Sequence, residues 1–163
     1  MRFSKQHTLN DCTPVALANA LKWAGKSISY SREKALWCKA VGYDTRVGGT
    51  SWWTTSSSFV REGEGLFSVV TLHNPLVREI ERHLLGGGAL VLSYLFFHER
   101  LDRFCRHTVF IPEISQDRQS FRVINQGLET DKFVSRESFV KYFLRFRRET
   151  NPTTVYLLSK EKG

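Results

Sequence analysis

Three apolar segments of strand length follow one another in the second half of the chain, with no helical segment between them. They cover residues 89–97, 107–114 and 120–127. Strands joined by such short connections pair antiparallel, because a parallel pair needs a crossover of a dozen or more residues. The run therefore predicts an antiparallel β-sheet built around these segments.

Hydrophobic periodicity and end signals predict the remaining elements. The expected helices cover residues 12–24, 32–40, 51–62, 75–88 and 136–148, and the expected further strands cover 66–72 and 154–159. Helices come first and the sheet follows, which favours an α+β fold with N-terminal helices packed on a mostly antiparallel β-sheet. A chain of 163 residues with 41% hydrophobic residues fits one domain, spanning 1–163.

Charge and cysteine content narrow the classes of partner and cofactor. The chain has 24 Lys+Arg against 16 Asp+Glu, a formal charge of +8, which suits either anionic partners or a solvated basic surface. It contains no nucleic-acid-binding motif, so nucleic acid ranks last among the partners. The three cysteines are few, odd in number and without metal-site spacing, which predicts neither a disulfide scaffold nor a structural metal. With no signal-peptide core and no run as long as a membrane span, the sequence predicts a cytoplasmic protein.

Cys12 is placed where a polar segment becomes an apolar helix. Asn10 and Asp11 are suitable N-cap residues, and Pro14 is tolerated in a first turn. A thiolate at a helix N-terminus lies near unpaired N–H groups and the positive end of the helix dipole, which lowers the pKa of a cysteine. Cys12 is therefore a candidate nucleophile, whereas Cys38 and Cys105 are expected to be packing residues.

A nucleophilic cysteine also needs a base, a group that orients the base, and oxyanion donors. His107 is expected to begin the strand 107–114, and Asn125 to end the next one. If these strands pair antiparallel, the two residues become neighbours, and Asn125 can accept from one imidazole nitrogen. Gln6 can donate an N–H to an oxyanion, together with the backbone N–H of Cys12.

Other residues compete for these roles. His98 lies on the predicted loop at the other end of the same hairpin and competes with His107. Asn125 is also an ordinary turn residue before Gly127. Asp117 and Asp131 are then the fallback orienting groups.

The segment "QHTLNDCTPVALANAL", followed far downstream by "HTVFI" and "VIN", resembles the papain-like cysteine peptidases. The resemblance is closer to the bacteriocin-processing branch, which cleaves after double glycine, and to its stand-alone relatives. It covers nearly the whole chain. It implies a papain-like fold with Cys12 as nucleophile, His107 as base and acid, Asn125 as orienting group and Gln6 as oxyanion donor, acting on a peptide or isopeptide bond without a cofactor.

The chain departs from the family pattern at two positions. Thr13 stands where the family usually has glycine, so its side chain could narrow the approach to Cys12, and Asn125 stands where the closer branch usually has aspartate. Gly49, Thr50 and Trp52 are expected to line a groove for a peptide or protein substrate, with small residues or Gly-Gly at the cleavage site. A silent binding module and an acyl-transfer or deamidase variant remain the alternatives, and the sequence predicts no oligomeric state.

Overall fold

The computed structural model describes residues 2–5, 12–29, 52–126 and 129–162 of the chain. These residues form helices, strands and one 3-10 turn. In chain order they are α1 (Cys12–Trp23), α3 (Trp52–Glu62), β1 (Phe67–His73), α4 (Val77–Leu85), β2 (Ala89–His98), the 3-10 turn η2 (Glu99–Leu101), β3 (Arg103–Ile114), β4 (Ser120–Gln126), β5 (Glu129–Ser135), α5 (Arg136–Phe143) and β6 (Thr154–Lys160).

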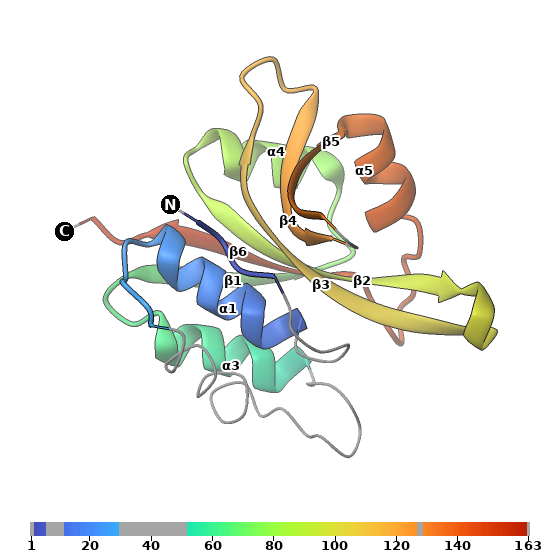
Figure 1. Ribbon diagram of the computed structural model, residues 1–163, viewed down its shortest axis with the longest axis horizontal. Coiled ribbons are helices and arrows are strands. Elements are labelled where there is room, and N and C mark those ends of the chain that lie inside the picture. The colour runs from blue at the N-terminus through green and yellow to red at the C-terminus, as the bar shows by residue number, and fades with distance from the viewer. Residues whose placement is uncertain (1, 6–11, 30–51, 127–128, 163) are drawn as a thin grey trace.

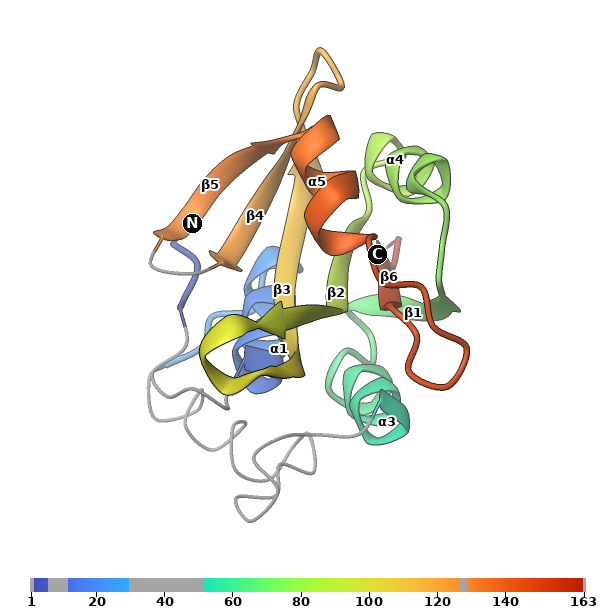
Figure 2. The ribbon, with the colours of Figure 1, turned by 90° about the vertical axis from the view of Figure 1, so that its right-hand side faces the viewer.

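The strands form one six-stranded sheet in the order β1-β6-β2-β3-β4-β5. Each neighbouring pair is antiparallel. Helices α1 and α3 cover one face of this sheet, and α4 and α5 cover the other (Figures 1 and 2). The predicted α+β architecture, with helices on an antiparallel sheet, is confirmed.

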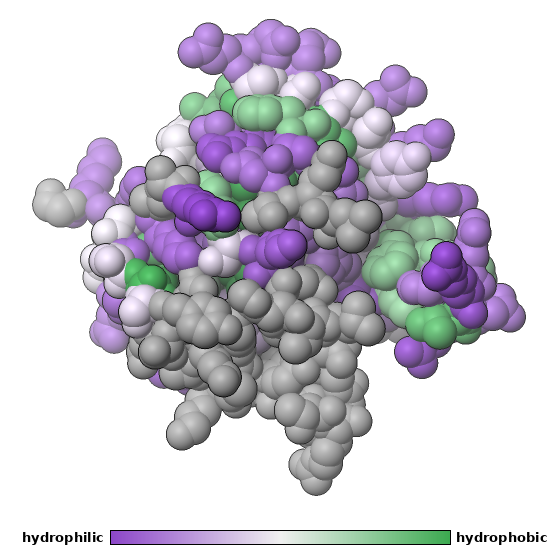
Figure 3. Space-filling view, in the orientation of Figure 1, coloured by the Kyte–Doolittle hydropathy of each residue, from purple (hydrophilic) through white to green (hydrophobic). Residues whose placement is uncertain are grey.

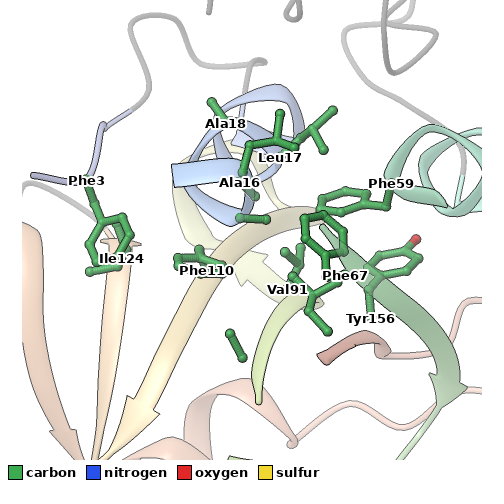
Figure 4. Close-up of a cluster of buried hydrophobic side chains, with 14 residues drawn as sticks. Phe3, Ala16, Leu17, Ala18, Phe59, Phe67, Val91, Phe110, Ile124 and Tyr156 are labelled. Atoms are coloured by element: carbon green, nitrogen blue, oxygen red, sulfur yellow. The ribbon is translucent and has the colours of Figure 1, made fainter. Parts of the chain in front are cut away.

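Helix α1 is buried along most of its length, where it packs on the sheet. All its residues from Thr13 to Leu21 are buried, which is typical of a central helix. Ala16, Leu17 and Ala20 pack with Phe110 and Tyr156 of the sheet in one cluster (Figure 4). This packing fixes the first turn of α1 against β3.

A second apolar cluster lies under α4 and α5, on the opposite face of the sheet. Ile80 and Phe139 from the helices meet Leu92, Val109 and Phe121 from the strands, all fully buried. The Phe121 and Phe139 rings stack with centroids 4.1 Å apart. Helix α5 begins at an N-cap, because the Ser135 side chain accepts a hydrogen bond from the backbone N–H of Ser138.

Several predicted boundaries are wrong, and one strand was not predicted. Strand β3 begins at Arg103, so His107 does not begin a strand but lies inside one. Strand β5 was not predicted, because the residues of this edge strand whose burial is described are exposed or half-buried and show no apolar alternation. Helix α5 ends at Phe143 and not at 148, while Phe146 packs edge-to-face on Phe104, 5.0 Å away. The helix predicted at 32–40 lies outside the described residues.

The hairpin of β2 and β3 projects beyond the rest of the sheet (Figure 1). Phe97, Leu101 and Phe104 are exposed near its tip, where the surface shows an apolar area among hydrophilic residues (Figure 3). Phe104 is covered on one side by the guanidinium of Arg148, 4.1 Å from the ring centroid. The N-terminal part of β3 belongs to this extension and lies beyond Phe110, where the pairs with β4 end. His107 lies in this part of β3.

Candidate active site

Cys12 and His107 lie together where the first turn of α1 meets β3. Cys12 is the first residue of α1, so its backbone N–H has no partner within the helix. Its side chain forms a hydrogen bond with the imidazole of His107. Both side chains are half-buried, so the pair is held in place yet remains open to solvent. The sequence predicted that these two residues meet, and the structure brings them together.

The register of β3 and β4 explains why His107 also reaches Asn125. The ladder between these strands ends at the pair Phe110 and Ile124, and Asn125 is the next residue of β4. His107 Nε2 lies 2.8 Å from the backbone carbonyl oxygen of Asn125. A carbonyl oxygen only accepts, so Nε2 carries the hydrogen and donates it. The other nitrogen, Nδ1, is thereby left for the sulfur of Cys12.

The imidazole of His107 is thus held by the backbone carbonyl of Asn125. The sequence predicted that Asn125 accepts this hydrogen bond because it is an asparagine, which points to its side-chain amide. Asn125 is buried and has a φ of 70°, a left-handed conformation that asparagine adopts more readily than most residues. The left-handed residue directly follows the last pair of the β3–β4 ladder. The alternatives lie elsewhere: Asp131 pairs with Arg122, and Asp117 caps its own turn through Ser115 and Gln119.

The charges of Cys12 and His107 stabilise each other. Burial raises the pKa of the Cys12 thiol, but the hydrogen bond and positive charge of His107, with two hydrogen bonds from Thr108, outweigh burial and lower that pKa below its ordinary value. Burial lowers the pKa of His107, but Cys12 and the Asn125 carbonyl outweigh it and raise that pKa. Both directions favour a thiolate beside an imidazolium, the charge state of an activated nucleophile.

Two further residues at this site were not found from the sequence. Tyr94 is the register partner of His107, and its ring meets the imidazole edge-to-face at 5.9 Å. Burial, and then the charge of Cys12, raise the pKa of the Tyr94 phenol, so the phenol stays neutral. Thr108 contacts the sulfur itself. Tyr94 could be assigned to the site only from the register of β2 and β3. That register depends on where the loop between the two strands begins and ends, which the sequence did not predict.

The remaining predicted site residues are placed as follows. Gln6, Gly49 and Thr50 lie outside the described residues, and Trp52 is described only as the first residue of α3. Asn19, two turns after Cys12 on α1, holds the chain just before Gln6: its amide donates to the Ser4 carbonyl and accepts from the Ser4 N–H. The competitor His98 ends β2, and Cys12 and Cys105 are both free thiols.

Within the described part of the chain, no three His, Cys, Asp or Glu side chains gather as a metal site. No helix in that part is long and apolar enough to cross a bilayer.

Comparison with known proteins gives the fold a name. No protein-family model matches the sequence, and no curated protein does. A crystal structure of a Bacillus anthracis protein described as a C39-like peptidase superposes with a TM-score of 0.64 at 13% identity, covering 99% of this chain and 96% of that one. The chain has the C39-like, papain-like fold.

A second solved structure agrees with the first. It is a double glycine motif protease from an AMS/PCAT transporter, solved in complex with its leader peptide. The TM-score is 0.60 at 13% identity, over 97% of this chain and 91% of that one. The C39-like fold therefore accounts for nearly every described element, and the resemblance inferred from the sequence is confirmed at the level of the fold.

Proposed function

We propose that this protein is a cysteine peptidase that cleaves a peptide or isopeptide bond, and that residues 1–163 form one peptidase domain. The observation that carries the proposal is the hydrogen bond between Cys12, at the start of a buried helix, and His107. The C39-like fold supports it. Each partner favours the charged form of the other, which a merely structural cysteine does not require.

The reaction follows from the atoms present. The Cys12 thiolate attacks the substrate carbonyl carbon, and the oxyanion is held by the backbone N–H of Cys12 and, we infer, by the Gln6 amide. His107 Nδ1–H gives its proton to the leaving nitrogen as the C–N bond breaks, leaving a thioester. Water then attacks the thioester while Nδ1 takes a proton, and the thiolate leaves. Asn125 keeps the imidazole in the required tautomer through its carbonyl.

The substrate class is inferred from the fold and the sequence together. One structural neighbour was solved with a leader peptide, which supports an extended peptide as the substrate of this protein. We infer that small residues or Gly-Gly precede the cleaved bond, with Gly49, Thr50 and Trp52 lining the groove. The free thiols Cys12 and Cys105 suit a reducing compartment, and we place the enzyme in the cytoplasm.

Limiting alkylation with iodoacetamide at pH 6, followed by peptide mapping, tests the proposal. An ordinary thiol with a pKa of about 8.5 is ionised to only about 0.3% at this pH. Cys12 is expected to react first, and the Cys12→Ala variant identifies its peptide. The His107→Ala variant is expected to react at Cys12 at least about 100-fold more slowly, because burial then acts on the thiol without the imidazolium.

Cys38 and Cys105 are internal references in the same sample. If Cys12 in the folded wild type reacts no faster than they do, the peptidase proposal is wrong and a silent binding module takes its place. If Cys12 is activated, a peptide library with Gly-Gly and small-residue sites, analysed for hydrolysis and for transfer to added amines, separates a peptidase from an acyl-transfer enzyme.

A further inference from the structure

Two threonines join the helix that carries the nucleophile to the strand that carries the base. Thr13 follows Cys12 and Thr108 follows His107, and their hydroxyl oxygens lie 3.1 Å apart. Thr13 is 8% exposed and Thr108 is 2% exposed, so bulk water does not replace either partner. The Thr13 side chain is thus directed into the interface of α1 and β3, and not across the approach to Cys12.

Thr108 also contacts the reacting atom. Hydrogen bonding from its backbone N–H and from its hydroxyl helps to lower the pKa of the Cys12 thiol, so both donors face the sulfur. A hydroxyl carries a single hydrogen, so Thr108 donates to one partner at a time. When the hydroxyl of Thr108 donates to the sulfur, the contact with Thr13 persists only if Thr13 donates to the Thr108 oxygen.

We propose that Thr13 and Thr108 form a hydroxyl relay that places one hydrogen-bond donor on the Cys12 sulfur while the sulfur is a thiolate. The proposal rests on the proposed peptidase function. In the thiolate state, Thr13 donates to Thr108 and Thr108 donates to the sulfur, so the two bonds polarise each other. In the thioester the sulfur is uncharged and a poor acceptor, and the Thr108 hydroxyl turns to donate to Thr13. Thr108 is then a catalytic residue, and Thr13 is a positioning residue that acts through it.

The test is the pH dependence of Cys12 alkylation by iodoacetamide, measured for the full chain. A hydrogen bond to a charged group is strong enough for its loss to move the midpoint by about one pH unit, roughly a tenfold loss of thiolate below the midpoint. The Thr108→Val variant is expected to show this upward shift. Thr13→Val is expected to shift in the same direction by less, and Thr13→Ser, which keeps the hydroxyl, is expected to match the wild type.

A double variant and a matched control distinguish the relay from a purely structural role, in which the contact between Thr13 and Thr108 only stabilises the packing of α1 on β3. Because Thr13 acts through Thr108, the variant carrying both valines is expected to shift no further than Thr108→Val alone. Thr153→Val makes the same chemical change at a buried threonine whose hydroxyl donates to the Phe146 carbonyl, 3.0 Å away. It is expected to lose stability without moving the midpoint.

Midpoints unchanged in both Thr108→Val and Thr13→Val overturn the relay and leave the peptidase proposal standing. An ordinary midpoint in the wild type that His107→Ala does not change overturns both, so the two failures are distinguishable. Circular dichroism establishes that each variant is folded. If Thr108→Val does not fold, the comparison of Thr13→Val with Thr13→Ser decides: equal midpoints overturn the relay.

Discussion

The contact between His107 and the main chain of Asn125 leads to a prediction that separates two ways of orienting the base. If the carbonyl orients the imidazole, the residue type at position 125 matters only through the backbone conformation that it allows. Asn125 has a φ of 70°, which glycine adopts without strain, whereas a β-branched residue adopts it at a cost of at least about 1–2 kcal/mol. Asn125→Gly and Asn125→Val both remove the side-chain amide and differ in this respect.

The expected magnitude follows from the bond that valine would disturb. The Nε2–H of His107 donates to the Asn125 carbonyl over 2.8 Å, and this contact helps to raise the pKa of His107. A hydrogen bond from a charged donor contributes about 1.5–3 kcal/mol, so turning the carbonyl away destabilises the imidazolium that keeps Cys12 ionised. Alkylation of Cys12 at pH 6 is expected to fall about 10- to 100-fold in Asn125→Val and to stay within a few-fold of wild type in Asn125→Gly.

The assay is the second-order rate of iodoacetamide labelling at Cys12, with Cys38 and Cys105 as references in the same digest. Urea unfolding of each variant reports stability separately, because both lose a buried polar side chain. Should Asn125→Gly lose as much reactivity as Asn125→Val, the side chain and not the carbonyl orients His107, and the reasoning fails.

Three further predictions concern the scaffold. Phe59→Ala removes a fully buried ring that stacks on Tyr156 at 5.5 Å and is expected to lower the free energy of unfolding by about 3–5 kcal/mol in urea titrations; a loss below about 1 kcal/mol would contradict this packing. Ser135→Ala removes the N-cap of α5 and is expected to cost about 1 kcal/mol in the same titration, whereas Ser135→Asp is expected to restore it. Arg122 lowers the pKa of Asp131 in the folded protein. The pair therefore contributes stability at pH values above the pKa that Asp131 has in the unfolded chain, and this contribution is lost as the pH falls through its lower pKa in the folded protein. Asp131→Asn is therefore expected to be slightly less stable than wild type at pH 7, by under about 1 kcal/mol, and equal to it near pH 2; a gap that persists at pH 2 would refute the ion-pair origin.

Elements that bury a continuous apolar face were predictable from the sequence, and those that do not were missed. The periodic helix after Cys12 and the apolar strand predicted at 89–97 were found, since burial determines their patterns. The edge strand β5 and the first residues of β3 carry polar or exposed side chains, and no periodicity marks them. Their pairing is set by the neighbouring strand, which one sequence does not reveal.

The candidate site divides in a similar way. The proximity of Cys12, His107 and Asn125 could be inferred, because strand pairing carries His107 and Asn125 to the same end of the β3–β4 ladder. Which atom of Asn125 meets the imidazole could not, since it depends on a left-handed φ at the end of β4. The link from Thr13 to Thr108 depends on the docking of α1 on β3, which no local pattern encodes.

The division of the reactive pair between the first helix and a later strand has a consequence during synthesis of the chain. Thr13 and Thr108, the immediate neighbours of the pair, are 95 residues apart in the sequence. A nascent chain that has not yet presented β3 therefore exposes an ordinary, weakly ionised thiol at Cys12. Under the proposed function, reactivity arises only when the sheet has formed and α1 has docked, so an incomplete or misfolded copy is expected not to attack the proteins around it.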